Sequence, residues 1–127
     1  MGQYLIDTNI VSDYFTSSIP SDGMLFMGSV IDAIPNLSII TQIELLCWKT
    51  EKSLEHKIEN FIMDSTILDI DSEVVKLCVK IRKNKKIKTP DAIIAATALA
   101  NNYILITNNE IDFKHIKGLK IQNPHRL

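Results

Sequence analysis

The alternation of short apolar runs with helix-like segments is the feature that most constrains the fold of this chain. Each run is apolar throughout, as strands buried on both faces are, and each leads into a segment with helical spacing. The expected strands are Tyr4–Ile6, Leu37–Ile40, Thr66–Ile70 and Tyr103–Ile106, with Leu119–Ile121 as a short optional fifth. This order predicts an α/β fold with a central parallel sheet of four or five strands flanked by helices.

Turn signals separate the helical segments. The expected helices are Ile10–Phe15, Met24–Ile34, Thr41–Lys49, Leu54–Met63, Glu73–Lys83 and Pro90–Ala100. Pro35 ends the second of them, and Thr89 is expected to cap the last, with Pro90 at its first position. With 127 residues, 46% of them hydrophobic, the chain has the size of one globular unit. We therefore expect a single domain over residues 1–127.

Composition also limits the setting in which the protein works. No apolar run reaches the roughly 18 residues that a membrane span needs, and no basic segment leads into a longer apolar one. Cys47 and Cys78 lie in apolar helical patterns without the spacing of a zinc site, so we expect two core thiols in a reducing compartment. A soluble, cytoplasmic protein without membrane contact is expected.

Three acids stand where the chain leaves a predicted strand or enters a helix. Asp7 follows "YLI", Glu44 lies three residues after Thr41, and Asp91 opens the Ala-rich helix. Parallel strands place such positions at one edge of a sheet, where α/β folds bind ligands. Ionised carboxylates gathered there repel one another unless a cation holds them. The pattern predicts a Mg²⁺ or Mn²⁺ site.

Each acid also has a purely structural explanation. Thr41–Glu44 and Thr107–Glu110 both match a capping box, in which the acid bonds back to the helix start. Asp7 could cap the first helix, and Asp91 in a first turn is favoured by the helix dipole. Three independent caps have no reason to gather at one edge of one sheet, however, so the set favours a site.

Charge is unevenly distributed along the chain. Residues 1–75 carry three basic side chains and twelve acids, a balance of −9, whereas residues 76–127 carry eleven basic side chains and three acids, a balance of +8. A basic run that includes Lys83, Lys85, Lys86 and Lys88 ends just before Asp91. Such a run can be a solvated helix end, but beside an acidic pocket it is the expected contact for an RNA backbone.

Together these segments resemble the PIN-domain nucleases, and most closely the VapC-type toxins of bacterial toxin–antitoxin pairs. The resembling stretches are "YLIDTNIVSDYF", "SIITQIELL", "TPDAIIAATALANNYILITNNEIDF" and "IKGLKIQNP". Their order and spacing are specific, whereas Thr16–Leu37 and Cys47–Lys88 match weakly. The resemblance implies a parallel sheet flanked by helices, with an acidic pocket at one edge.

The resemblance also implies roles for individual residues. The first three acids of the family fall on Asp7, Glu44 and Asp91, as catalytic and metal-binding residues. The fourth position varies within the family: here it is either Asp112 or Asn109, and Asp112 is favoured because a carboxylate binds a divalent ion more tightly. The remaining polar residues of these motifs, Thr8, Asn9, Thr107 and Asn109, would support the carboxylates, and Glu110 is expected to be a cap.

The function implied is a Mg²⁺- or Mn²⁺-dependent endoribonuclease, the toxin of a type II pair, in which the ion activates water and polarises a phosphodiester. The implied partners are an RNA substrate, a cognate antitoxin protein and a second copy of the chain. Apolar content places Met24–Ile34 and Leu45–Trp48 at or near the dimer interface. The alternative is a catalytically silent PIN-like module that binds RNA or protein.

Overall fold

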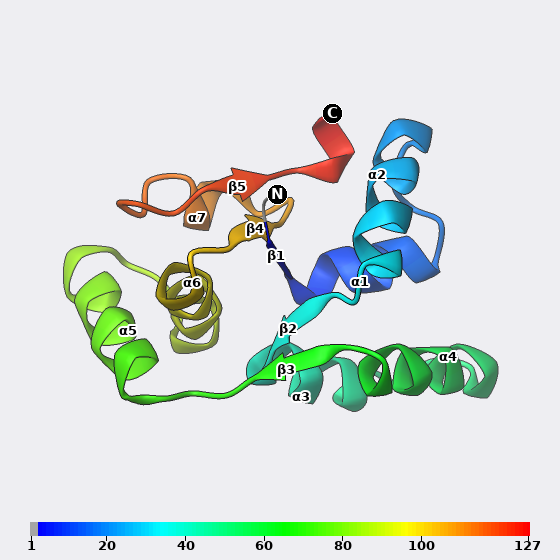
Figure 1. Cartoon of the computed structure of the whole chain (residues 1–127), viewed down its shortest axis with the longest axis horizontal. Coiled ribbons are helices and arrows are strands. Elements are labelled where there is room, and N and C mark those ends of the chain that lie inside the picture. The colour runs from blue at the N-terminus through cyan, green and yellow to red at the C-terminus, as the bar shows by residue number, and fades with distance from the viewer. Residues whose placement is uncertain (1–2) are drawn as a thin grey trace.

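The computed structural model describes residues 3–127, which form a five-stranded sheet with helices on both faces (Figure 1). The strands are β1 (Tyr4–Ile6), β2 (Asn36–Ser38), β3 (Thr66–Leu68), β4 (Ile104–Ile106) and β5 (Ile121–Gln122). Their order is β3-β2-β1-β4-β5, and all four neighbouring pairs are parallel. The α/β prediction is therefore confirmed, including the short fifth strand.

The helices follow the expected order with shifted ends. They are α1 (Thr8–Phe15), α2 (Ser21–Asp32), α3 (Ile39–Cys47), α4 (Lys52–Met63), α5 (Ser72–Asn84), α6 (Thr89–Asn101) and α7 (Glu110–Phe113), followed by the 3-10 turn η1 (Pro124–Arg126). The helix start expected at Thr41 is wrong, and the alternative of a capping box there does not hold, because Ser38 caps α3: its Oγ accepts a hydrogen bond from the backbone N–H of Ile40. The start of α3 two residues before Thr41 moves Glu44 into the second turn of the helix.

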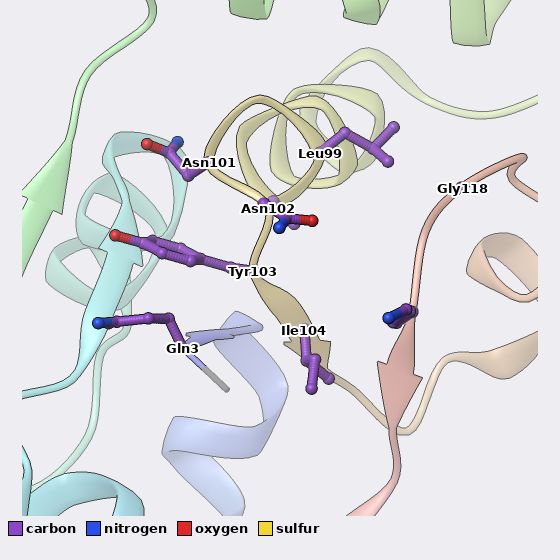
Figure 2. A pocket seen from close by; sticks show the side chains of 9 residues that line it. Gln3, Leu99, Asn101, Asn102, Tyr103, Ile104 and Gly118 are labelled. Atoms are coloured by element: carbon purple, nitrogen blue, oxygen red, sulfur yellow. The ribbon is translucent and has the colours of Figure 1, made fainter. Parts of the chain in front are cut away.

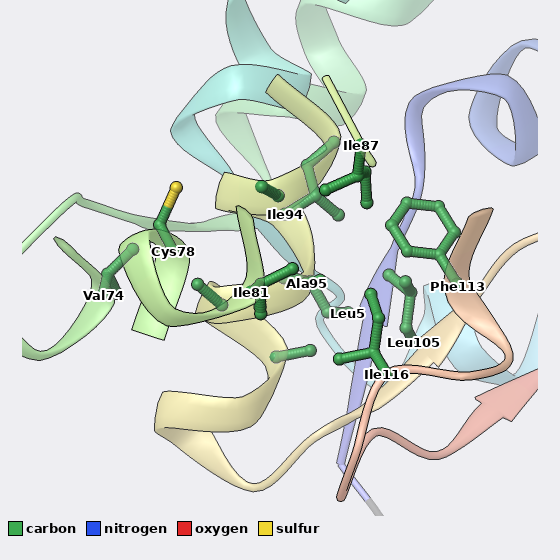
Figure 3. Close-up of a cluster of buried hydrophobic side chains, with 13 residues drawn as sticks. Leu5, Val74, Cys78, Ile81, Ile87, Ile94, Ala95, Leu105, Phe113 and Ile116 are labelled. Carbon is green, nitrogen blue, oxygen red and sulfur yellow. The ribbon is translucent and has the colours of Figure 1, made fainter. Parts of the chain in front are cut away.

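Alternation along the central strands divides the core into two layers. Leu5 pairs with Leu105 and Ile6 with Ile106 across β1 and β4, and all four side chains are fully buried. Leu5 and Leu105 contact the layer built by α5, α6 and α7 (Figure 3). The isoleucines contact the opposite layer, to which α1, α2 and α4 contribute. Helices on both faces explain why these strands are apolar without interruption.

The two cysteines differ in their surroundings. Cys78 lies on α5 and is buried in the first layer, as expected. Cys47, at the end of α3, is exposed, so the expectation that it is a core residue is wrong. Its apolar neighbours belong to a helix whose outer face remains uncovered in the single chain, with Leu46 54% exposed.

The amino ends of the strands carry a cavity of about 370 Å³ (Figure 2). Its lining includes Gln3, Asn102, Tyr103 and Lys120, and the part that the structure describes contains no carboxylate. Here Asn102, which caps the C-terminal end of α6, adopts the left-handed conformation. Across the described residues, 3–127, no helix is both long enough and apolar enough to span a membrane.

The segment after β5 returns to the first half of the chain. Gly23 on α2 lies so close to η1 that a Cβ atom there would stand 2.0 Å from the carbonyl oxygen of Pro124. His125 Nε2 lies 2.9 Å from Asp13 Oδ2 of α1. η1 is thus fixed against both α1 and α2 by a close backbone approach and a side-chain pair.

Candidate active site

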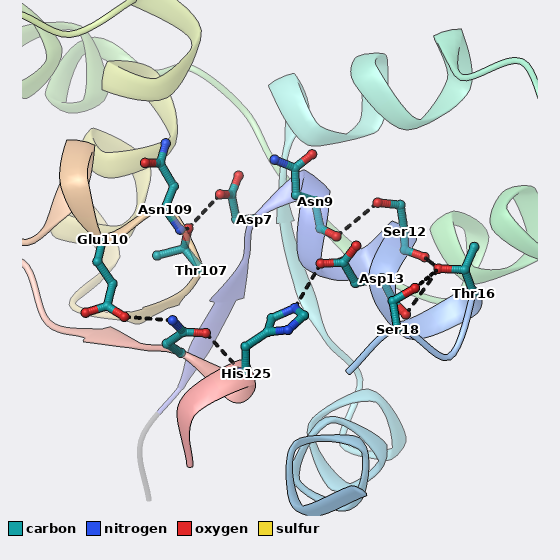
Figure 4. Close-up of polar contacts among 11 residues, drawn as sticks. Asp7, Asn9, Ser12, Asp13, Thr16, Ser18, Thr107, Asn109, Glu110 and His125 are labelled. Atoms are coloured by element: carbon teal, nitrogen blue, oxygen red, sulfur yellow. Dashed lines mark hydrogen bonds and ion pairs between the residues drawn. The ribbon is translucent and has the colours of Figure 1, made fainter. Parts of the chain in front are cut away.

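Asp7 lies at the centre of the candidate site. It follows β1 at the carboxyl edge of the sheet and caps α1, and it is only 6% exposed. Its Oδ1 accepts a hydrogen bond of 2.8 Å from the backbone N–H of Thr8, and its Oδ2 accepts one of 2.8 Å from Thr107 Oγ1 (Figure 4). The structural role as a cap and the position at the sheet edge therefore coexist in one residue.

The surroundings of Asp7 favour its neutral form. The pKa of Asp7 is raised to about 6, chiefly by burial and to a smaller extent by the charges of Asp91 and Glu44. The hydrogen bonds from Thr107 and Thr8 act in the opposite direction and stabilise the carboxylate. A bound cation would stabilise the ionised form of a buried carboxyl that has two other acids nearby.

Glu44 reaches the centre through Thr8. Thr8 Oγ1 donates a hydrogen bond of 2.6 Å to Glu44 Oε1 and lies 3.1 Å from Thr41 Oγ1, which is fully buried. The backbone N–H of the same Thr8 binds Asp7. One residue therefore positions two carboxylates, Asp7 at the cap of α1 and Glu44 in α3. Thr41 supports Thr8 rather than capping α3.

Asp91 enters from the first turn of α6. The helix begins at Thr89 rather than at Pro90, with Lys88 as the capping residue and no side-chain capping bond. Partial burial raises the pKa of Asp91, as do the charges of Asp112 and Glu44, while that of Lys88 lowers it. Asp91 therefore lies within electrostatic range of Asp112 and Glu44.

Asp112 is joined to the centre by a chain of hydrogen bonds. Thr107 Oγ1 accepts from the backbone N–H of Asn109 at 3.0 Å, and Asn109 Nδ2 donates to Asp112 Oδ2 at 2.9 Å. Asn109 Oδ1 in turn accepts from the backbone N–H of Asp112 at 3.3 Å and so caps α7. The two candidates for the fourth position, Asp112 and Asn109, are therefore bonded partners.

Glu110 has a different role from the cap expected for it. Its Oε2 accepts hydrogen bonds from Asn123 Nδ2 at 2.7 Å and from Arg126 at 2.9 Å. The bond from Asn123, followed by the charge of Arg126, lowers the pKa of the Glu110 carboxyl. Both partners belong to the segment after β5, so Glu110 connects α7 to the C-terminal turn (Figure 4).

The remaining predicted residues lie around this centre. Asn9 is exposed on α1 and lines a shallow cavity of about 400 Å³ beside Glu44, together with Trp48 of α3. The lysines of the basic run all follow from the end of α5 toward α6, and Lys85 is the most covered of them. They are Lys83, Lys85, Lys86 and Lys88.

The donor atoms offered by this site are oxygens of carboxylate, hydroxyl and amide groups, the type preferred by Mg²⁺ and Mn²⁺. Within residues 3–127, no three His, Cys, Asp or Glu side chains stand close enough to hold an ion by themselves. Asp7 and Asp91 nevertheless affect each other's charge. An ion that keeps several waters and binds through one or two carboxylates fits this spacing, as Mg²⁺ does in phosphoryl-transfer enzymes.

Comparison with known proteins agrees with this geometry. The profile of the PIN domain family matches residues 4–119, most of the chain. The chain belongs to the PIN-domain family. This PIN-domain chain is also 33% identical over 124 residues to Ribonuclease VapC1 of Methanocaldococcus jannaschii, an alignment that covers 92% of the chain and 85% of the relative. The resemblance to VapC-type PIN proteins seen in the sequence is confirmed.

Solved structures support the same assignment. A chain of a toxin–antitoxin complex from Klebsiella pneumoniae superposes with a TM-score of 0.76 at 29% identity, covering 98% of this chain and 100% of that one. A chain of DNA-bound VapBC from Salmonella typhimurium gives a TM-score of 0.79 at 21% identity, with coverage of 98% and 99%. At 21% identity, the similarity to the Salmonella typhimurium chain shows a shared fold and nothing more.

Proposed function

We propose that this PIN-domain protein is a Mg²⁺- or Mn²⁺-dependent endoribonuclease and the toxin of a type II toxin–antitoxin pair. The observation that carries the proposal is the buried Asp7 carboxylate, whose pKa is raised to about 6 by burial and by nearby acids. A carboxylate whose only role is to cap a helix gains nothing from acidic neighbours. A catalytically silent module is disfavoured, because it has no use for mutually repelling carboxylates.

The metal would be held by Asp7 and Asp91, with Glu44 and Asp112 binding it through water or directly. When bound, it would polarise the scissile phosphate and lower the pKa of a coordinated water. The protein's own groups prepare this site: Thr8 fixes the carboxylates of Asp7 and Glu44, and the hydrogen bond from Thr107 partly offsets the effect of burial on Asp7. The four acids, Asp7, Glu44, Asp91 and Asp112, are the proposed catalytic residues.

Asn109 acts as a positioning residue in this scheme. Its amide donates to Asp112 Oδ2 and its carbonyl oxygen caps α7, so it fixes the carboxylate and leaves the second Asp112 oxygen available. This arrangement supports Asp112 as the proposed fourth family position. Thr8, Asn9 and Thr107 complete the polar shelf around the acids.

The substrate is proposed to be RNA on the strength of charge as well as family. The acids repel a phosphate backbone, so a nucleic acid needs compensating cations beside them. Lys83, Lys85, Lys86 and Lys88 precede Asp91 directly along the chain, and no ion pair among the described residues engages them. They are proposed to contact phosphates on either side of the scissile bond.

The partners proposed are a cognate antitoxin and a second copy of the chain. The Klebsiella pneumoniae relative was solved as a toxin–antitoxin complex, which supports the first. Leu25 on α2 is 76% exposed and Leu46 on α3 is 54% exposed, which supports interface roles for Met24–Ile34 and Leu45–Trp48. We also propose that residues 1–127 act as one domain in the cytoplasm.

The deciding experiment incubates purified protein with total RNA in Mg²⁺, in Mn²⁺ or in EDTA, and maps the new RNA ends. The proposal expects cleavage with either metal and none with EDTA. Asp7→Asn, which preserves shape and removes charge, is the matched inactive control. RNA binding without cleavage in any metal would instead favour the silent module.

Association is tested separately. Light scattering at micromolar concentration should give the mass of a dimer, and Leu46→Glu should shift it toward a monomer because a charge would be buried at the interface. For the antitoxin, we expect a C-terminal segment that presents an Arg or Lys to Asp7, Glu44 and Asp91. A complex in which these acids remain open to solvent would contradict that mode of inhibition.

A further inference from the structure

The largest cavity of those described lies away from the acids, between α5, the end of α6 and the loop that follows α7. It has a volume of about 710 Å³. In Figure 1, α5 and this loop flank α6 on the same side of the molecule. Its lining includes Leu77, Lys80, Lys85, His115, Ile116 and Lys117. Nothing in the proposed chemistry uses this cavity.

Its lining combines apolar surface with a cationic rim. Leu77 is half-buried and Ile116 is nearly covered, so both offer apolar walls, while Lys80, His115 and Lys117 are exposed around them. No ion pair within residues 3–127 involves these two lysines. An apolar floor with free cations at its edge fits a ligand that is both flat and anionic.

The acidic and basic residues of the cavity lining lie at opposite ends of it, with the basic end toward the acidic site. Glu73, the acid in the described lining, lies at the start of α5, about two turns before Lys80. Lys85 lies at the other end, and it also belongs to the basic run that leads to Asp91. The six residues from Lys85 to Asp91 span at most about 21 Å. Basic side chains therefore extend from the cavity to the proposed catalytic acids.

From this arrangement we propose that the cavity is a second RNA-binding subsite, which holds a nucleotide of the same strand that is cut at Asp7 and Asp91. An unpaired base would lie between Leu77 and Ile116 and against the His115 imidazole, and flanking phosphates would contact Lys80, Lys85 and Lys117. Even at the rise of about 3.4 Å per nucleotide of a fully stacked strand, at most about six nucleotides separate the two positions. This inference rests on the proposed ribonuclease function.

An acidic peptide is the other anion that could enter a basic cavity. The apolar walls and the continuity with the cleavage site favour RNA, because a polyanion must pass the run of lysines to reach the acids. A protein ligand has no such need to follow that path. The two occupants make opposite predictions about dependence on RNA length.

The test measures fluorescence anisotropy of labelled single-stranded RNAs of about 4 and about 16 nucleotides, the range of single-strand site sizes. Asp7→Asn protein is used so that the RNA stays intact. The exposed pair Lys80→Gln/Lys117→Gln should weaken binding of the long RNA on the order of tenfold and lower its salt slope by about 1.4. Affinity for the short RNA should stay within about twofold, since it does not span both positions.

The control pair Lys52→Gln/Lys57→Gln removes the same charge from α4, on the other layer of the sheet, and should leave both affinities unchanged. As a second readout, 4-thiouridine in the long RNA should crosslink to segments containing Leu77 or Ile116. Equal loss in both variant pairs, or crosslinks confined to other segments, would overturn the subsite. Binding of polyglutamate that depends on Lys80 and Lys117, with RNA affinity unaffected, would assign the cavity to a protein instead.

Cleavage of the short RNA by the parent protein in Mg²⁺ separates this inference from the function on which it rests. If the parent does not cut, but the long RNA still binds through Lys80 and Lys117, the ribonuclease proposal fails and the cavity is an RNA-binding site without a role in cleavage. If the parent cuts both RNAs and the lysine variants bind the long one normally, the subsite fails alone.

Discussion

Thr107 Oγ1 donates a hydrogen bond of 2.8 Å to Asp7 Oδ2, although one hundred residues separate the two in the chain. The contact follows from the register of the central strands, because Ile6 pairs with Ile106 and the next residue of each strand leaves the sheet at the same edge. Both side chains are buried. The bond stabilises the ionised form of an acid that burial otherwise neutralises.

Thr107→Val should therefore lower metal affinity and RNA cleavage. The loss of a hydrogen bond to a carboxylate costs about 1.5–3 kcal/mol, so cleavage at neutral pH should fall on the order of tenfold to a hundredfold. Thr107→Ser keeps the hydroxyl and should retain most of the activity. Cleavage rates at saturating Mg²⁺ and Mg²⁺ titrations on both variants provide the measurement, and equal rates in the two would contradict the role given to the hydroxyl.

Asp7→Asn should abolish cleavage but stabilise the metal-free protein at neutral pH. The pKa of Asp7 rises from 3.8 to about 6 on folding, so the folded state binds the proton more tightly and parent stability falls as pH rises through that interval. A shift of this size corresponds to about 3 kcal/mol above pH 6. Urea denaturation in EDTA should show the variant more stable at about pH 8 and equal to the parent at about pH 3.

Asp112→Asn and Asn109→Ala separate the two candidates for the fourth position. Asp112→Asn removes a charge and should weaken Mg²⁺ binding strongly. Asn109→Ala only releases the Asp112 carboxylate from its 2.9 Å bond, so it should have the smaller effect on Mg²⁺ affinity. Calorimetric titration of Mg²⁺ into each variant gives the comparison. The reverse order of effects would move the fourth role to Asn109.

Replacing Lys83, Lys85, Lys86 and Lys88 by Gln should weaken RNA binding and flatten its dependence on salt. Each lost phosphate contact on a single strand reduces the slope of log affinity against log salt by about 0.7. Affinity for Mg²⁺ should change little. An unchanged slope would identify the run as an ordinary solvated surface.

Gly23→Ala should destabilise the fold, whereas Gly28→Ala on the same helix should not. A Cβ atom at Gly23 would stand 2.0 Å from the Pro124 carbonyl oxygen, while at Gly28 its nearest neighbour is the Tyr14 hydroxyl at 4.0 Å. We expect a loss of about 1–3 kcal/mol for Gly23→Ala from overpacking. Gly28→Ala should gain about 0.5–1 kcal/mol from helix propensity. Thermal unfolding of both variants tests the packing of η1 on α2.

The order of strands and helices could be predicted from the sequence because β1 and β4, at the centre of the sheet, are covered on both faces and are apolar without interruption. Their ends could not. Ser38 competes with Thr41 for the start of α3, and the two residues look alike as caps until the length of β2 is known. The short helix α7 was missed because its four residues are too few to show a period.

The acids of the site could be named from their places after strands, but the bonds between them could not. The contact of Thr8 with Glu44 spans 36 residues of chain, and nothing local specifies it. Glu110 was expected to cap its own helix, yet its partners are Asn123 and Arg126. Both lie at η1, which can pack closely on α2 because Gly23 has no side chain. Such assignments depend on tertiary neighbours rather than on spacing.

The segment after β4 also has a consequence for the timing of synthesis. The backbone N–H of Thr107 is held by Gln122 of β5, and Glu110, beside Asp112, is held by Asn123 and Arg126. Residues 122–126 leave the ribosome after every acid of the site. A nascent chain that still has them inside the exit tunnel lacks the edge strand and the anchor of α7. The acidic centre is therefore completed only after residues 122–126 have left the exit tunnel.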